Sequence, residues 1–199
     1  MSITAAMVKE LRDKTNAGMM DCKKALSECD GDMEKSVDFL RQKGLAVAAK
    51  RAGRESSEGQ VMSYIHGGGK LGVLVEVNCE TDFAGKTDEF SAFAKDLAMQ
   101  VAAANPLCVN EEDLPEDIVA REREIYRAQA LDSGKPEKIV DKIIEGKMKK
   151  FVKESCLMSQ VFVKDSDLTI EDLLNEMRAK TGENVQIRRF ARFELGEQS

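Results

Sequence analysis

Apolar residues in the N-terminal part of the chain recur every three or four positions, which is the period of an α-helix. Thr4 can cap a first helix, and a second helix starts at Met19. The turn Asp30-Gly31-Asp32 leads to a third helix that ends near Gly44. The residues expected on the buried sides of these helices are Val8, Leu11, Cys22, Ala25, Leu26, Cys29, Val37 and Leu40. The pattern predicts a three-helix module over residues 1–47.

A charged stretch with serine and glycine, residues 48–59, has no apolar period, and we interpret it as a linker. Beyond it the period becomes that of a strand. Residues 60–66 and 71–80 alternate on either side of Gly67-Gly68-Gly69, as the two strands of a β-hairpin do. One face of the second strand holds Leu71, Val73, Val75, Val77 and Cys79. We expect that face to be core.

Helical periods return after a short loop at Thr81–Lys86. One helix follows with an apolar stripe, two more open at Pro115 and Pro136, and a shorter one follows Thr169. The stripe consists of Phe90, Phe93, Leu97 and Val101. The tail alternates again, and one parity holds Val185, Ile187, Ala191, Phe193 and Leu195, a row that Arg189 interrupts. The simplest assembly is an α+β core domain over residues 60–199, in which helices cover antiparallel strands.

Composition and charge exclude several classes of protein. The chain has 199 residues, 42% hydrophobic and 33% charged, so it can bury a core beneath a highly charged surface. Its net charge of −6 argues against a dedicated nucleic-acid binder, which carries a basic excess to neutralise phosphates. No apolar run approaches the roughly 20 residues needed to cross a bilayer, and no secretory signal pattern is found. The five cysteines lack any CxxC or paired spacing. We expect a cytoplasmic protein that does not bind membranes.

The sequence lacks recognisable motifs for nucleotide binding, metal binding or catalysis. The run Gly67-Gly68-Gly69-Lys70 is not a phosphate-binding loop, because Tyr64 and Leu71 stand where a glycine and a Ser or Thr are required. A hairpin turn explains the glycines. The single histidine, His66, has no Ser or Cys nucleophile at an indicative spacing. We therefore predict that the chain is not an enzyme and has no cofactor or metal site.

Two features allow both a structural and a functional interpretation. The lysines between Lys147 and Lys153 could contact RNA or phosphate, but their place at a helix end favours a role in complementing the helix dipole. Phe83 lies among acidic residues where a strand ends. Periodicity favours a buried ring. An outward ring would instead be an aromatic anchor for a partner, next to the carboxylate of Asp82.

Four separated segments carry a resemblance. They are VKELRDKTNAGMMDCKKAL near the N-terminus, Thr81-Asp82-Phe83, EGKMKKF at Glu145–Phe151 and the closing RFELGE. Together, in this order, they resemble bacterial translation elongation factor Ts over nearly the whole chain. That family consists of guanine-nucleotide exchange factors for elongation factor Tu, the GTPase that delivers aminoacyl-tRNA to the ribosome. The resemblance implies a ubiquitin-associated-like three-helix domain joined to an α+β core.

The resemblance also implies which residues contact the GTPase. Thr81, Asp82 and Phe83 match a loop whose aromatic ring intrudes between helices of the GTPase domain near its Mg²⁺ and phosphate site. An exchange factor of this kind needs no nucleotide site or catalytic group of its own, because it acts through binding energy. Such a mechanism agrees with the missing motifs.

Two further contacts follow from the resemblance. Met19, Met20 and Lys23 match a segment of the first domain that packs on the same GTPase domain. His66 and Gly67 match a strand-end pair in the core that meets another domain of the partner.

The chain departs from the family pattern in places. Ala84-Gly85 replaces the usual Val-Ala after the aromatic residue, which predicts less apolar surface and a looser backbone there. Gln160-Val161-Phe162-Val163 replaces Gln-Pro-Phe-Val, so its turn is expected to differ. Long members carry two copies of the strand-hairpin unit, whereas this chain has one. We interpret it as the short form, in which a homodimer supplies the missing half.

Two other functions stay open at this point. A non-catalytic adaptor would use the three-helix module to bind a peptide or a ubiquitin-like partner. An RNA-binding protein would use Lys147–Lys153 and Arg188–Arg192, although the negative net charge disfavours it and we expect no direct nucleic-acid binding.

Overall fold

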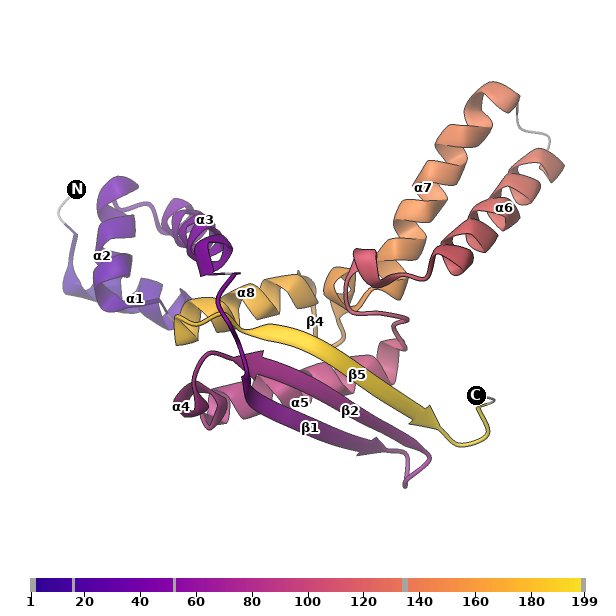
Figure 1. Ribbon diagram of the computed structural model, residues 1–199. Helices are drawn as coiled ribbons and strands as arrows, with labels where there is room; N and C mark the ends of the chain where they lie inside the picture. The colour runs from indigo at the N-terminus through magenta and orange to yellow at the C-terminus, as the bar shows by residue number, and fades with distance from the viewer. Residues whose placement is uncertain (1–2, 16, 52, 134–135, 198–199) are drawn as a thin grey trace. The chain divides into compact units, whose positions relative to one another are not determined.

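The computed structural model describes residues 3–15, 17–51, 53–133 and 136–197 (Figure 1). It has the predicted α+β composition. The elements, in chain order, are α1 (Ala5–Thr15), α2 (Met19–Glu28), α3 (Met33–Arg51), β1 (Glu58–His66), β2 (Leu71–Cys79), α4 (Asp82–Gly85), α5 (Asp88–Ala104), α6 (Glu116–Asp132), α7 (Glu137–Ser155), β3 (Val161–Phe162), β4 (Asp165–Thr169), α8 (Ile170–Thr181) and β5 (Gln186–Glu194). No described helix combines the length and apolar character that crossing a bilayer requires.

The chain forms two compact units, each made of segments that are distant in sequence. Unit 1 contains Met1–Gly59, Asn78–Phe90 and Leu173–Gln186. Unit 2 contains Gln60–Val77, Ser91–Asp172 and Ile187–Ser199. The domain boundaries predicted at residues 47 and 59 stay a prediction.

Unit 1 holds the predicted N-terminal helices. Thr4 Oγ1 accepts a hydrogen bond from Met7 N (3.3 Å) and so caps α1. α3 continues to Arg51, past the end predicted near Gly44, because the Leu- and Ala-rich segment after this glycine favours helix. The buried core of the three helices consists of Val8, Leu11, Cys22, Ala25 and Leu26, with Val37 and Leu40 packed against it.

The larger sheet has the strand order β1-β2-β5. Gly67, Gly68 and Gly69 all have positive φ, which makes the predicted turn between β1 and β2. β5 runs antiparallel to β2, since Leu195 N donates to Lys70 O (2.8 Å) at one end and Arg189 pairs with Glu76 further along. The inward positions of β2 are buried as predicted at Val73, Val75, Val77 and Cys79, whereas Leu71, predicted on the same face, is half-buried.

The apolar row predicted in the tail is divided in the structure. Ile187 is buried, whereas Phe193 and Leu195 on the same parity are 69% and 79% exposed. Arg189 lies between them and forms an ion pair with Glu76 (2.6 Å). The alternating pattern therefore indicated a strand correctly, but it did not indicate that the apolar side chains near the end of the strand are exposed among the residues that the structure describes.

Unit 2 also contains a helical hairpin and a small sheet. α6 and α7 pack along Ala130, Val140, Ile144 and Met148. β3 and β4 form an antiparallel pair that the sequence analysis did not anticipate. The buried Gln100 side chain holds β3 in place, because it donates to Val161 O (3.1 Å) and accepts from Val163 N (2.9 Å). These bonds satisfy a buried amide that would otherwise be destabilising.

Candidate partner-binding surface

α4, placed in a loop by the sequence analysis, is a single helical turn that carries Phe83. Thr81 is its N-cap, and Thr81 Oγ1 accepts a hydrogen bond from Ala84 N (3.3 Å). Ala84 and Gly85 turn inward and are buried, so Phe83 turns outward and is 84% exposed. The ring is therefore exposed to solvent, as the family resemblance implied. Periodicity alone favoured a buried ring, and that prediction is wrong. A helix of four residues is not stable by itself, so contacts from other segments hold it.

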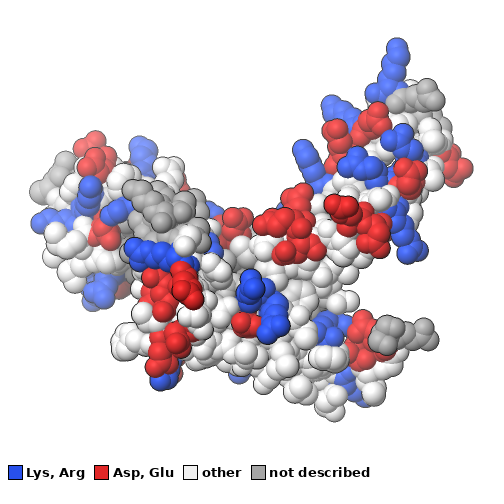
Figure 2. Space-filling view, in the orientation of Figure 1, with Lys and Arg blue, Asp and Glu red and all other residues white. Residues whose placement is uncertain are grey.

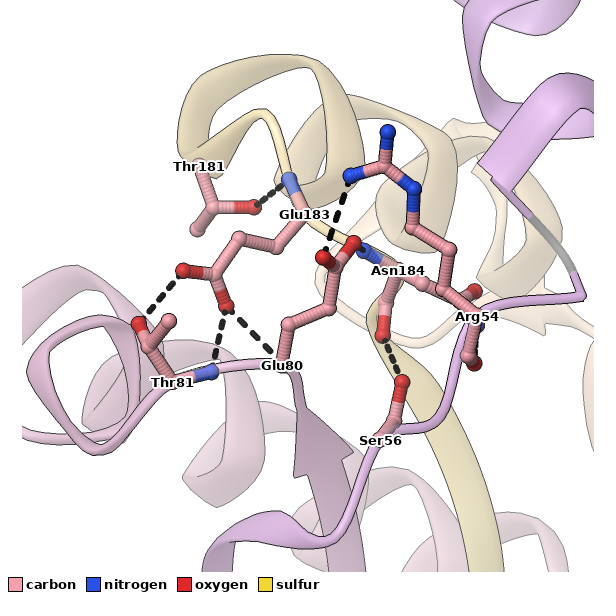
Figure 3. A network of polar contacts seen from close by, with 7 residues as sticks. All are labelled: Arg54, Ser56, Glu80, Thr81, Thr181, Glu183 and Asn184. Atoms are coloured by element: carbon pink, nitrogen blue, oxygen red, sulfur yellow. Dashed lines mark hydrogen bonds and ion pairs between the residues drawn. The ribbon is translucent and has the colours of Figure 1, made fainter.

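The carboxylate of Glu183 supplies the contacts at the start of this turn (Figure 3). Glu183 Oε2 accepts hydrogen bonds from Glu80 N (3.0 Å) and Thr81 N (3.1 Å). Glu183 Oε1 accepts a hydrogen bond from Thr81 Oγ1 (2.5 Å). Thr81 Oγ1 thus donates to Glu183 and accepts from Ala84, which fixes the orientation of its hydroxyl.

A second set of polar contacts holds the segment that carries Glu183. Asn184 N donates to Glu80 Oε1 (2.7 Å), and Asn184 Nδ2 donates to Arg54 O (2.8 Å). Ser56 Oγ donates to Asn184 O (2.6 Å), and Arg54 forms an ion pair with Glu80 (3.2 Å). Figure 3 shows these groups converging from the segment before β1, the end of β2 and the loop after α8. Asn184 is 1% exposed, so the network is partly shielded from water.

Close packing holds the other end of the turn. A Cβ at Gly85 would stand 3.2 Å from Gly59 Cα and 3.3 Å from Cys79 Sγ. Gly85 N also donates to Thr81 O (3.2 Å). The looser backbone expected at Gly85 is not found, because the missing side chain lets β1 approach closely at Gly59. Burial raises the pKa of the Cys79 thiol in this contact.

Asp82, next to the exposed ring, has a partner within α4. Its carboxylate forms an ion pair with Lys86 Nζ (2.6 Å), one helical turn later, and both side chains are largely exposed. The hydrogen bond from Lys86 to Asp82 raises the pKa of the lysine. Asp82 is therefore available to a partner only if this surface pair opens or if the partner accepts the pair together.

Met19, Met20 and Lys23 begin α2 in the same compact unit as α4. Met19 is 59% exposed, Met20 is 76% exposed and Lys23 is exposed too. Two adjacent exposed methionines present flexible, polarisable apolar surface of the kind found at protein interfaces. The buried residues that α2 contributes to the three-helix core are Cys22, Ala25 and Leu26, so these exposed side chains are not among them.

His66 and Gly67 lie in unit 2, where β1 ends and the hairpin turns. His66 Nδ1 and Tyr64 Oη are 2.8 Å apart. His66 is exposed, and Tyr64 is half-buried. Gly67 has a φ of +61°, so a side chain there would be strained. The predicted contact residues are thus divided between the two units, with Thr81, Asp82 and Phe83 in unit 1.

The outward side of the larger sheet is a second exposed apolar surface, and it lies within unit 2. We call it the outer sheet face; its residues are Val61, Ile65, Leu74, Phe193 and Leu195. A groove of about 580 Å³ runs along Ile65, Leu74, Phe193 and Leu195, and a smaller one joins Val61 to Leu74. The apolar side chains therefore form a continuous patch, whereas Phe83 is a single ring.

The lysines that suggested RNA binding are mixed with acidic residues. Lys147 Nζ lies 5.2 Å from the Tyr126 ring centre and 2.6 Å from Gln129 Oε1, and Lys150 pairs with Glu154 (3.6 Å). Figure 2 shows Lys and Arg interspersed with Asp and Glu over α6 and α7. Binding of a phosphate backbone favours a continuous basic surface, which this hairpin does not present on the face shown.

Chemically reactive groups are few in the part of the chain that the structure describes. No group of three or more His, Cys, Asp or Glu side chains there could hold a metal ion. Cys108 and Cys156 are buried with their sulfur atoms 3.5 Å apart. Burial is the main cause that raises the pKa of Cys108 to about 12, so this thiol is protonated at neutral pH and a poor nucleophile.

No motif or spacing in the sequence pointed to Glu183, Asn184, Arg54 or Ser56 as part of this site. The only local signal was the helix stop at Thr181-Gly182, which places polar residues directly after α8. Since 102 residues separate Glu183 from Thr81, no spacing rule relates them.

Comparison with known proteins identifies the family. The profile described as "Elongation factor TS" matches residues 3–198. The chain belongs to the elongation factor Ts family. A protein named elongation factor Ts from Desulfosudis oleivorans is 65% identical over 196 residues, covering 98% of this chain and 99% of the relative. Those from Carboxydothermus hydrogenoformans and Syntrophobacter fumaroxidans are each 63% identical, covering 98% and 100% of this chain and 90% and 99% of the relatives. The chain therefore has a role in translation elongation.

Proposed function

We propose that this protein is a guanine-nucleotide exchange factor that binds elongation factor Tu and displaces GDP by disturbing the Mg²⁺ and phosphate site of that GTPase, which allows GTP to load. The observation that carries the proposal is the 84% exposure of Phe83 on a turn whose next two residues, Ala84 and Gly85, are buried and whose N-cap, Thr81, is hydrogen-bonded. A rigidly supported ring loses little conformational entropy on entering a pocket, as an anchor residue should.

Exchange follows from thermodynamic linkage. A factor that binds the nucleotide-free GTPase more tightly than the GDP-bound form must weaken GDP binding by the same ratio. Burial of one phenylalanine ring stabilises a complex by up to roughly 3 kcal/mol, which can offset part of the distortion of the phosphate site. The protein would then act without a chemical step, cofactor or metal ion of its own.

The remaining affinity would come from surfaces outside α4. Met19, Met20 and Lys23 form an exposed patch that suits a second contact with the GTPase domain, and His66 with Gly67 suits a contact with another domain of the partner. These contacts fix the position of the complex, while Phe83 acts on the nucleotide site. The site of action would be the cytoplasm, where translation elongation takes place.

A homodimer formed through the outer sheet face is part of the proposal. Ile65 is 65% exposed, Phe193 69% and Leu195 79%, and they border one groove with Leu74. Contiguous exposed apolar surface of this kind marks a protein interface more often than a monomer surface. The ion pair between Arg189 and Glu76 would lie at the polar edge of such an interface.

The experiment that tests the proposal measures release of a fluorescent GDP analogue from purified elongation factor Tu while the protein is titrated in. We expect release to accelerate and to saturate with concentration. Binding to elongation factor Tu without faster release would contradict exchange and support an adaptor. Steeply salt-dependent RNA binding with no effect on release would support the RNA-binding alternative.

A further inference from the structure

The Phe83 turn depends on a residue that lies far from it in the sequence. We infer that Glu183 is a positioning residue for nucleotide exchange, holding Thr81 and α4 so that Phe83 is presented in one fixed orientation. This inference rests on the proposed function for its role in exchange, although its structural half can be tested without the partner. Glu183 does not need to contact the GTPase.

The geometry makes Glu183 the main external support at the start of α4. One carboxylate oxygen accepts from both Glu80 N and Thr81 N, and the other accepts from the Thr81 hydroxyl. Hydrogen bonds to an ionised acceptor are stronger than those between neutral groups. Because the Thr81 hydroxyl in turn caps Ala84 N, loss of Glu183 would also loosen the hydrogen bond within the turn.

Glu183 is itself held in place, so it can act as a support. Glu183 N donates to Thr181 Oγ1 (3.2 Å), and Thr181 Oγ1 donates to Met177 O (2.9 Å) at the end of α8. Gly182 has a φ of +69°, and its N donates to Arg178 O (2.9 Å), which ends the helix in a left-handed turn. The end of α8 and the contacts of Asn184 with Arg54 and Ser56 therefore hold Glu183 from outside α4.

The orientation of Phe83 depends on how the ends of α4 are held. Its side chain is 84% exposed, and α4 is only one turn long. Support comes from Glu183 at one end and from the close approach of Gly85 to Gly59 at the other. With the first support removed, the turn would sample other orientations, and only a fraction of molecules would present the ring correctly. An effective rate falls in proportion to that fraction.

The test uses Glu183→Gln, which keeps the size of the side chain but removes its charge and one acceptor oxygen. Its matched control is Glu176→Gln, because Glu176 is exposed on α8 in the same unit. Thr81→Val removes the hydroxyl that donates a hydrogen bond to Glu183, and Thr81→Ser retains a hydroxyl at this position. Thermal unfolding followed by circular dichroism establishes that each variant is folded at the assay temperature.

The functional measurement is release of the GDP analogue from elongation factor Tu across a range of factor concentrations. We expect Glu183→Gln to lower the maximal release rate by about tenfold, because hydrogen bonds to a charged acceptor are lost. The half-saturating concentration should change less. Thr81→Val should lower the release rate by a similar factor, whereas Thr81→Ser should keep most of the wild-type rate. The double variant with Glu183→Gln and Thr81→Val should lower the rate by less than the product of the two single factors, because both substitutions break the same hydrogen bond.

The structural measurement needs no partner. The chain contains no tryptophan, so Phe83→Trp introduces a single reporter at the exposed position. In this background we expect Glu183→Gln to lower the fluorescence anisotropy of the reporter and Glu176→Gln to leave it unchanged.

The outcomes separate this inference from the proposed function. Unchanged anisotropy in a folded Glu183→Gln variant overturns the inference. Lower anisotropy with an unchanged release rate also overturns it, because position would not matter for exchange. If the wild-type protein fails to accelerate release, the proposed function is contradicted, and the anisotropy alone still decides whether Glu183 orients the turn.

Discussion

Phe83 and Phe193 are both phenylalanines that the fold leaves exposed, at 84% and 69%. Their surroundings differ. Phe83 stands alone on a short turn next to the charged pair of Asp82 and Lys86. Phe193 belongs to the outer sheet face and borders a groove with Ile65, Leu74 and Leu195.

The difference indicates two kinds of contact. A lone ring on a clamped turn can enter a narrow pocket of a partner, and its energy is concentrated in one side chain. A broad apolar sheet face excludes water only against another broad face, and its energy is distributed over many side chains. We therefore propose that Phe83 serves nucleotide exchange and that Phe193 serves self-association.

The largest expected effect is on exchange. Phe83→Ala should lower the rate of GDP release by about 100-fold, since up to roughly 3 kcal/mol of ring burial is lost. The melting temperature should barely change, because an exposed side chain contributes little to folding. Fluorescent GDP release and differential scanning calorimetry measure the two quantities. Equal release rates for Phe83→Ala and wild type would contradict the proposed wedge.

The next effect concerns self-association. Phe193→Asp places a carboxylate in the outer sheet face and should weaken the homodimer by at least about tenfold, because the charge loses hydration in the interface. Sedimentation equilibrium measures the dissociation constant. Phe83→Asp is the matched control and should leave it unchanged. A wild-type chain that is monomeric at all concentrations would exclude the dimer.

A smaller effect separates the support of Phe83 from the ring itself. Gly85→Ala should lower the free energy of unfolding by about 1–2 kcal/mol, because the added Cβ meets Gly59 Cα at 3.2 Å. Gly146→Ala in α7 is the control: a Cβ there has nothing within 4 Å, so it should raise stability by up to about 1 kcal/mol. Urea unfolding measures both. An unchanged or raised stability of Gly85→Ala would argue against close packing beneath α4.

The smallest effect concerns the ion pair beside Phe83. Asp82 raises the pKa of Lys86, so the pair stabilises the fold fully below the ordinary lysine value of 10.5 and loses this effect as pH rises above it. The stability difference between wild type and Lys86→Met should therefore be small and constant from pH 7 to about pH 10, and should then shrink. A difference that grows above about pH 10 would contradict this assignment.

Much of the fold could be predicted from local sequence patterns, whereas the turn that carries Phe83 could not. The strands around Gly67-Gly68-Gly69 and the stripe from Phe90 to Val101 follow from local periods, and the structure has both. The turn that presents Phe83 does not, because α4 is too short to have a period and its outward residue is apolar. Motif resemblance indicated that ring, and no local pattern indicated Glu183.

The sequence by itself determined the longer helices, the hairpin, the Thr4 cap and the family of this protein, because these depend on residues that are close in the chain or on motifs as such. Only the tertiary structure decided that Phe83 is exposed while Ile187 is buried, and that Glu183 supports Thr81. Exposure and hydrogen bonding depend on which distant segments meet. That pairing is set by the packing of the whole chain, which no window of neighbouring residues contains.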